Sequence, residues 1–200
     1  MLGEIVKPLF HITTRVAWNR SQAAREYRAP SLDTEGFIHL STEEQWRHTL
    51  HRLFRGVADL VILRIDPQLV DAEIRFEPAD GEVFPHLYGP LPTDAVINLR
   101  DAPRIIELAP GVAERITAAD DAIGEVVACA IEDHGRPQTY VVLGARPGRA
   151  GEIALDRARA TGAGLVDAGW MQVLSLPRHA DGTLDEVALL AYVESLVQDD

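Results

Sequence analysis

Apolar residues recur along the chain with two different periods, and these periods predict where helices and strands lie. In "TEEQWRHTLHRLFRG" the apolar side chains follow a helical spacing on one face, and Gly56 is suited to end the helix. That apolar face consists of Trp46, Leu50, Leu53 and Phe54. A second helix is predicted over "RVAWNRSQAAREY", where Thr13 or Thr14 can cap the first turn.

Short apolar runs bounded by turn residues predict the strands in the first half of the chain. These runs are "KPLFHITT", "FIHLS", "DLVILRID", "AEIRFEPA", "FPHLYG" and "DAVINLR". Six strands and two helices within about 100 residues indicate a mixed α+β domain.

The rest of the chain predicts a small αβ module. The strands "EVVACAIED" and "QTYVVLGA" form a hairpin around "HGRP", and a helix, a third strand and a final amphipathic helix follow. The chain is more acidic after Ala118 than before it, which supports a boundary at that point. We therefore expect two domains, residues 1–118 and residues 119–200.

Charge and composition narrow the function classes. The net charge is −12 and Lys7 is the only lysine, so we expect no nucleic-acid partner, because phosphate neutralisation requires clustered cations. No apolar run approaches the roughly 20 residues that cross a bilayer, and the first ten residues lack the apolar core of a secretory signal. The single cysteine, Cys129, fits a reducing compartment. We expect a cytoplasmic protein with no membrane partner.

Three predicted strands share an unusual pattern. Side chains alternate along a strand, so residues two apart lie on one face. Each of the three presents an apolar residue, a histidine and a hydroxyl on one face: Leu9, His11 and Thr13; Phe37, His39 and Ser41; Phe84, His86 and Tyr88. If these strands meet in one sheet, their imidazoles and hydroxyls line one cleft. Neutral imidazoles donate and accept hydrogen bonds, which suits ribose hydroxyls, amides and proton transfer.

Each of these polar residues also has a purely structural interpretation. A single histidine in a strand is most often packed and satisfied within the fold. Ser41 or Thr42 can cap the following helix, with Glu44 or Gln45 completing a capping box. Tyr88 can be a core residue whose hydroxyl bonds to the backbone. It is the threefold recurrence of the pattern that favours a shared site.

Metal and carboxylate chemistry are further alternatives. Three histidines and a water form a known zinc site, but ligands from separate strands have no diagnostic spacing, and we expect no metal. Beside the third strand, Glu77, Asp80 and Glu82 are candidate bases or ribose binders, or else the solvated turn of a hairpin.

The motifs also resemble those of a known family. "LFHITT", "EYRAPSLDTEGFIHLST" and "GEVFPHLYGPL" are similar, in order and spacing, to the motifs of the bacterial domain-of-unknown-function family 952, over about Pro8 to Leu99. That pattern is similar, more distantly, to the ADP-ribosyltransferase superfamily. The resemblance implies an ADP-ribosyltransferase-like fold, a mixed or antiparallel split sheet with two helices, and NAD as the cofactor.

The resemblance also implies roles for individual residues. His11 stands in the first motif, where a strand residue contacts the ADP-ribose part of NAD, and His39 stands in the second, closest to the two-histidine pattern of RNA 2′-phosphotransferases. The third motif carries no Glu-x-Glu or Gln-x-Glu, which argues against arginine-directed transfer. The catalytic candidates are His11, His39, His86 and Glu82, and the ligand-binding candidates are Thr13, Arg28, Ser41, Thr42 and Tyr88. Arg28 is suited to a phosphate, or is simply a loop arginine.

The second module resembles another family less closely. Over residues ~120–195, and above all in "VLSLPRHADGTLDEVAL", it is similar to the C-terminal subdomain of adenylate-forming enzymes. Thr183 occupies the position of that motif's catalytic lysine, so the resemblance implies a module that has lost adenylate formation. It implies instead an interaction or packing unit, for which an adenylating enzyme or a carrier protein is the expected partner of residues 120–200. An unrelated αβ module is the alternative.

The leading hypothesis is a protein that binds a nucleotide-like ligand, NAD or ADP-ribose, or another polar small molecule in a histidine-lined cleft, with ADP-ribosyl or related transfer as the enzymatic version. Two alternatives stay open. One is a non-catalytic scaffold for an adenylating enzyme or carrier protein, and the other is a cofactor-free tailoring enzyme in small-molecule biosynthesis.

Overall fold

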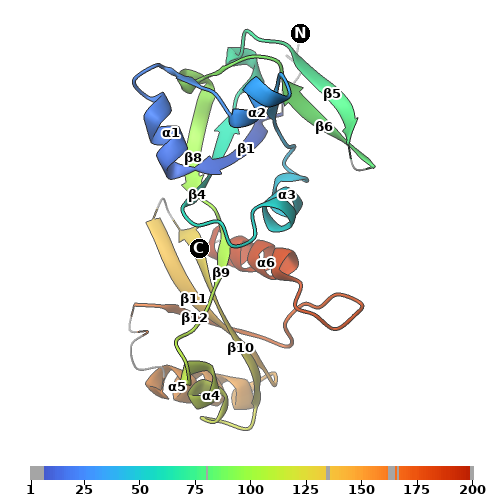
Figure 1. Ribbon diagram of the computed structural model, residues 1–200. Coiled ribbons are helices and arrows are strands. Elements are labelled where there is room, and N and C mark those ends of the chain that lie inside the picture. Colours follow the sequence, from blue (N-terminus) through green and yellow to red (C-terminus); the bar gives the residue numbers. More distant parts are fainter. Residues whose placement is uncertain (1–6, 80, 134–135, 162–164, 166, 199–200) are drawn as a thin grey trace, which may run out of the picture. The chain divides into compact units, whose positions relative to one another are not determined.

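A computed structural model describes residues 7–79, 81–133, 136–161, 165 and 167–198 (Figure 1). The chain divides into two compact units, Met1–Ala102 and Pro103–Asp200. Both units combine helices with antiparallel strand pairs, so the chain is α+β as predicted. Asp80 and the centre of the predicted "HGRP" turn, His134 and Gly135, lie outside the described residues.

The first unit contains the predicted helices and strands together with several very short elements. In chain order these are β1 (Leu9–Thr14), α1 (Arg15–Ser21), β2 (Glu26–Tyr27), α2 (Pro30–Thr34), β3 (Ile38–His39), α3 (Trp46–Leu53), β4 (Leu60–Ile65), η1 (Pro67–Leu69), β5 (Ile74–Ala79), β6 (Glu82–Leu87), β7 (Leu91–Pro92), η2 (Thr93–Ala95) and β8 (Val96–Asp101). Thr14 caps α1, accepting a hydrogen bond from the amide of Ala17 at 3.2 Å. The helix is shorter than predicted, because the chain turns through a left-handed Arg25 (φ 57°) into β2.

The strands of this unit form three small antiparallel sheets, with the orders β1-β4-β8, β3-β6-β5 and β2-β7. The three histidine-bearing strands therefore belong to two sheets. The segment after β3 links them, because Leu40 still donates to Pro85 while Ser41 exchanges two backbone hydrogen bonds of 2.8 Å with Phe10 of β1. The second histidine strand thus leaves one sheet and joins the other within a few residues.

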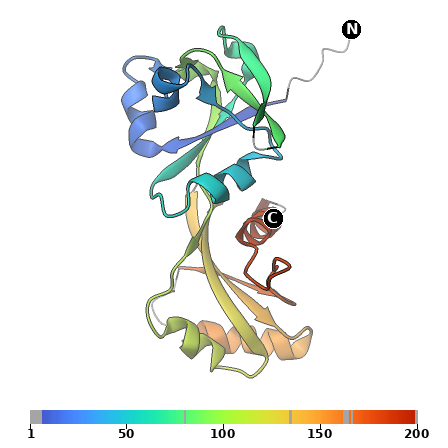
Figure 2. The same cartoon turned by 45° about the vertical axis from the view of Figure 1, so that its right-hand side comes forward.

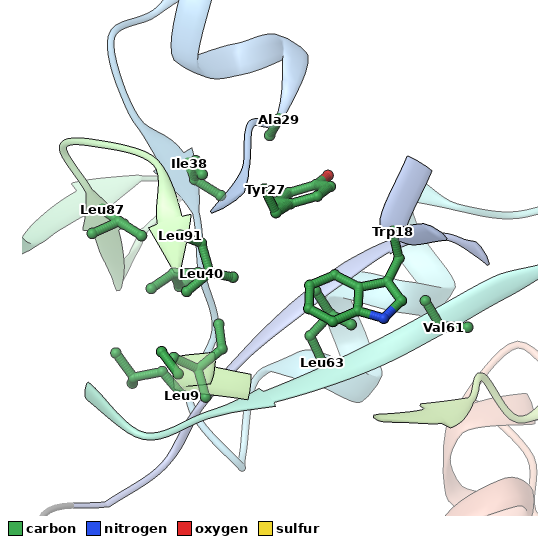
Figure 3. Close-up of a cluster of buried hydrophobic side chains, with 12 residues drawn as sticks. Leu9, Trp18, Tyr27, Ala29, Ile38, Leu40, Val61, Leu63, Leu87 and Leu91 are labelled. Atoms are coloured by element: carbon green, nitrogen blue, oxygen red, sulfur yellow. The ribbon is translucent and has the colours of Figure 1, made fainter. Parts of the chain in front are cut away.

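Alternation along β1 and β4 gives their sheet two apolar faces. Leu9, Val61 and Leu63 lie in the larger cluster, together with Trp18 and Tyr27 (Figure 3). The intervening residues of the two strands pack in a second cluster around Trp46 of α3, which is fully buried. Ile38 and Leu87 belong to the larger cluster, so the β3-β6-β5 sheet also has one face against this core.

The second unit is a four-stranded sheet with helices on both faces. Its elements are β9 (Arg104–Ile106), α4 (Val112–Thr117), β10 (Ile123–Asp133), β11 (Arg136–Ala145), α5 (Arg149–Thr161), β12 (Gly169–Val173) and α6 (Glu186–Gln198), and the sheet order is β12-β11-β10-β9. Helices α4 and α5 cover one face and α6 covers the other (Figure 2). The pairing of β11 with β12 is parallel, with α5 as the crossover helix.

The boundary between the units falls earlier than the change in charge suggested. Contacts divide the chain between Ala102 and Pro103, whereas the sequence placed the boundary after Ala118. The reason is that β9 pairs with β10, and Ile116 of α4 is fully buried against the second sheet. The distribution of charge reflects the composition of the surface. The positions of β9 and α4 depend instead on strand pairing and burial, which the charge pattern does not reveal.

Within the described residues, no helix has the length and apolar composition needed to cross a membrane.

Candidate functional site

His11 is held inside the fold by its neighbours. Its side chain is buried, with Nδ1 2.7 Å from the backbone oxygen of His39 and Nε2 3.1 Å from the hydroxyl of Tyr27. A carbonyl only accepts, so Nδ1 carries the proton and Tyr27 donates to Nε2. Thr13 lies 2.9 Å from the Tyr27 oxygen and completes a chain of donors and acceptors. His11 and Thr13 share a face as predicted, and that face is occupied by Tyr27.

Burial controls the ionisation of this network. Desolvation lowers the pKa of His11 to about 4, more than the bond to the His39 carbonyl raises it. Desolvation also raises the pKa of Tyr27, against the effect of the bond from Thr13. His11 is therefore neutral at neutral pH, and both ring nitrogens are used within the protein.

His39 and His86 lie side by side on the other face of the β3-β6-β5 sheet. They are direct cross-strand partners, and their ring centroids are 5.4 Å apart in an edge-to-face arrangement. Ile38 and Leu87 point to the core on the opposite face, which leaves this face to the two imidazoles. The structure thus brings together the rings of two of the three predicted histidines, and the hydrogen bond between His39 and His11 uses the backbone oxygen of His39.

The His86 imidazole is anchored at one nitrogen only. Nδ1 lies 2.8 Å from Oε2 of Glu77 on β5, and the Tyr88 hydroxyl donates to the same oxygen at 2.9 Å. Phe37 stacks on the His86 ring with a centroid distance of 4.2 Å. Nε2 of His86 is buried and has no hydrogen-bond partner within the part of the chain that the structure describes. A buried polar atom in this condition is rare and costly, and so points to function. We call Phe37, His39, Glu77, His86 and Tyr88 the His39–His86 cluster.

The other members of the cluster differ in exposure and charge. The side chain of His39 is 54% exposed, with Nε2 3.5 Å from a carboxylate oxygen of Glu35. Desolvation lowers the pKa of His39, and Glu35 partly opposes this shift. Hydrogen bonds from His86 and Tyr88 lower the pKa of Glu77, so this carboxylate is ionised at neutral pH.

The remaining predicted residues have structural partners. Ser41 is buried and bonds to Thr49, and the Thr42 amide donates to the Gln45 side chain at 3.1 Å, as in one half of a capping box. Glu82 is exposed and accepts a hydrogen bond from Gln45.

Arg28, a predicted ligand-binding residue, and Thr183, at the position of the missing catalytic lysine, each have a carboxylate partner within their own unit. Arg28 is paired with Asp33 at 3.2 Å beside α2, and its side chain is about half exposed. In the second unit, the amide and the hydroxyl of Thr183 both donate to Asp181, so this residue stabilises an exposed turn.

Glu77 is the residue whose importance the sequence left open. Its position near a hairpin turn is equally typical of a solvated residue, and the structure instead places it in β5 opposite Phe84, within reach of His86 and Tyr88. Strand pairing supplied the missing signal, since residues of adjacent strands on one face contact each other. Among the described residues, no group of three histidine, cysteine or carboxylate side chains could hold a metal ion.

Comparison with known proteins now bears on the first unit. Residues 12–99 match the model of a family described as "Protein of unknown function (DUF952)". A crystal structure of protein CC0527 from Caulobacter crescentus is 31% identical, with a TM-score of 0.46, and the match covers 52% of this chain and 91% of that protein. Residues 12–99 belong to the DUF952 family. The resemblance predicted for Pro8 to Leu99 is confirmed, and the DUF952 domain contains the whole His39–His86 cluster.

Two further solved structures resemble this chain. A solution structure of CC0527 is 33% identical, with a TM-score of 0.42, over 48% of this chain and 84% of that protein. Klebsiella oxytoca NpsA, in complex with 3-hydroxyanthranilyl-AMSN, is 14% identical, with a TM-score of 0.30, over 68% of this chain and 31% of NpsA. That similarity is too low to support a structural argument, so the origin of the second module stays a prediction. No curated protein matches the chain.

Proposed function

We propose that the DUF952 domain binds a nucleotide-like small molecule, with NAD and ADP-ribose as the first candidates, at the His39–His86 cluster. One observation carries the proposal: Nε2 of His86 is buried without a partner among the described residues, while Nδ1 of the same ring is fixed by Glu77. An unsatisfied buried nitrogen costs about 1–3 kcal/mol, and a ligand hydrogen bond at this atom removes that cost.

The exposed side of the cluster supplies the approach for the ligand. His39 is more than half exposed and borders His86, whereas the opposite side of the sheet is core. Phe37 is half-buried, and its ring adds an aromatic surface for a sugar or base. We expect a ligand to reach Nε2 by displacing the exposed His39 ring, which packs edge-to-face against His86.

The family resemblance suggests which reaction a bound ligand could undergo, namely ADP-ribosyl transfer. In an ADP-ribosyltransferase-like domain the protein holds NAD, stabilises the departing nicotinamide and orients a nucleophile. An imidazole whose far nitrogen is bonded to a carboxylate has the arrangement of a general base. His86 with Glu77 is suited to the last of these roles, and His11 is assigned to the fold.

Calorimetric titration with NAD and with ADP-ribose tests the proposal. The wild-type protein is expected to give saturable heat with at least one of them, and His39→Ala combined with His86→Gln is expected to abolish it. His48→Ala, which removes an exposed histidine on α3, is the matched control and keeps the heat. Circular dichroism of each variant confirms folding. An absence of heat with the wild type, or equal heat with the double variant, refutes the proposal.

A further inference from the structure

We infer that Nε2 of His86 accepts a hydrogen bond from an uncharged, hydroxyl-bearing group of the ligand, with Glu77 as the positioning residue, and that a phosphate does not occupy this place. The inference rests on the proposed function and specifies which part of the ligand lies over the cluster. It follows from the fixed tautomer of His86, from the charges on the same sheet face, and from the aromatic ring that covers the imidazole.

The hydrogen bond to Glu77 fixes the tautomer of His86. The Glu77 oxygen that faces Nδ1 of His86 also accepts the hydroxyl proton of Tyr88. An ionised carboxylate only accepts, so Nδ1 must carry its proton. With its proton on Nδ1, the imidazole presents Nε2 as the acceptor, so the partner of Nε2 must be a donor. Phosphate oxygens of a nucleotide are acceptors at neutral pH and cannot fill this role, whereas a sugar hydroxyl can.

The surrounding charges point the same way. Residues on this face and at its edges include four carboxylates, those of Glu35, Glu73, Glu77 and Glu82. Arg75 is the cation on β5 among them, and it is already bonded to Glu73 at 2.6 Å and lies over the Tyr88 ring at 4.1 Å. A dianionic group near these carboxylates would be repelled, and an uncharged polyol would not.

The Phe37 ring, stacked on His86, offers a flat apolar surface to the ligand. Phe37 lies nearly parallel to His86, at 20° between the planes, and also touches the rings of His39 and Tyr88. Nε2 is buried in the free protein and lacks a partner among the described residues, so a ligand donor that reaches this atom supplies the missing hydrogen bond. The apolar face of a sugar ring against Phe37, with its hydroxyls toward the imidazole, satisfies both requirements.

Nitrogen NMR of histidine-labelled protein tests the inference directly. In the free wild-type protein at neutral pH, long-range ¹H–¹⁵N correlations of His86 are expected to show a protonated Nδ1 and an unprotonated Nε2. Glu77→Leu is expected to give a mixture of tautomers, and Glu26→Leu, at an exposed residue of β2, leaves the His86 pattern unchanged. The spectrum reports the positioning role of Glu77 independently of stability.

Four probes then separate the possibilities. ADP-ribose and adenosine are expected to shift the Nε2 resonance of His86, whereas 2′,3′,5′-trideoxyadenosine, which has no hydroxyl, and inorganic phosphate are not. The inference is overturned if free His86 carries its proton on Nε2, if phosphate or the trideoxynucleoside shifts Nε2 as much as adenosine, or if ADP-ribose binds by calorimetry without moving the signal. Absence of calorimetric heat with both NAD and ADP-ribose counts instead against the proposed function.

Discussion

Among single residues, the two environments of histidine divide the predicted site into a structural and an accessible part. His11 uses both ring nitrogens in hydrogen bonds within the protein, whereas His86 uses only one in the part of the chain that the structure describes. The same strand pattern of apolar residue, histidine and hydroxyl thus gives two outcomes. The difference depends on Tyr27 and Glu77, which come from other strands and which no local pattern connects to the histidines.

Replacing His11 is expected to reduce stability and to leave the His39–His86 cluster intact. The carboxamide in His11→Gln cannot place its acceptor and its donor at both ring-nitrogen positions, so it loses the bond to Tyr27, the bond to the His39 carbonyl, or both. Unsatisfied buried groups cost about 1–3 kcal/mol each. We expect a loss of about 2–3 kcal/mol in the free energy of unfolding, measured by urea denaturation. His48→Gln, at an exposed position, serves as the control and is expected to change little. A loss as small as that of the control would contradict the structural role of His11.

The pH dependence of that loss follows from the lowered pKa of His11. The folded-state pKa of about 4 is below the unfolded value of 6.5, so between these values the unfolded chain binds the proton more readily. The contribution of His11 is complete above pH 6.5 and decreases toward pH 4 by up to about 1.4 kcal/mol per pH unit. The stability advantage of the wild type over His11→Gln should therefore shrink from pH 7 to pH 5, and a constant advantage would show that the pKa is not lowered.

At the scale of elements, long periodic segments were predictable and short ones were not. The strands now described as β1, β4, β10 and β11 and the helices α3, α5 and α6 were all predicted from their apolar patterns. The short strands β2, β7 and β9 span only two or three residues, too few to establish a period, and exist because other segments pair with them. The assignment of His39 and His86 as neighbours depended on such a pairing, that of β3 with β6.

A glycine in β12 offers a test of sheet packing. A Cβ at Gly169 would lie 2.4 Å from the ring of Tyr140, its partner on β11, whereas a Cβ at Gly124 of β10 meets only Gly144 O, at 3.6 Å. Gly169→Ala is expected to cost about 1–3 kcal/mol in unfolding free energy through overpacking. Gly124→Ala is the matched control and should stay within about 0.5 kcal/mol of the wild type. Urea denaturation measures both, and equal stabilities would contradict the close Gly169–Tyr140 contact.

For the whole molecule, the boundary between the two units lies between Ala102 and Pro103, and the stabilities of two C-terminal fragments test this position. The fragment of residues 103–200 retains β9 and α4, whereas the fragment of residues 119–200 loses them and exposes the surface that Val112 and Ile116 cover. Burial of these two side chains contributes on the order of 3 kcal/mol or more. Thermal unfolding should therefore show the longer fragment to be clearly more stable. Equal stability would place the boundary after Ala118, where the charge changes.

The proposed ligand site belongs to the DUF952 domain, because every residue of the His39–His86 cluster lies within the matched residues 12–99. The sequence could identify both histidines and the domain family. It could not show that Glu77 fixes one imidazole or that His11 is engaged by Tyr27, since both facts depend on strand pairing between distant segments. The proposed ligand class follows from this pairing.

A crystal structure of the protein with ADP-ribose tests the central claim most directly. The account predicts that the ligand lies over the β3-β6-β5 sheet, with a hydroxyl oxygen within hydrogen-bond distance of Nε2 of His86 and a sugar ring against Phe37. The claim is contradicted if ADP-ribose binds elsewhere, if a phosphate occupies the position beside Nε2, or if the His39–His86 cluster is unchanged at saturating ligand.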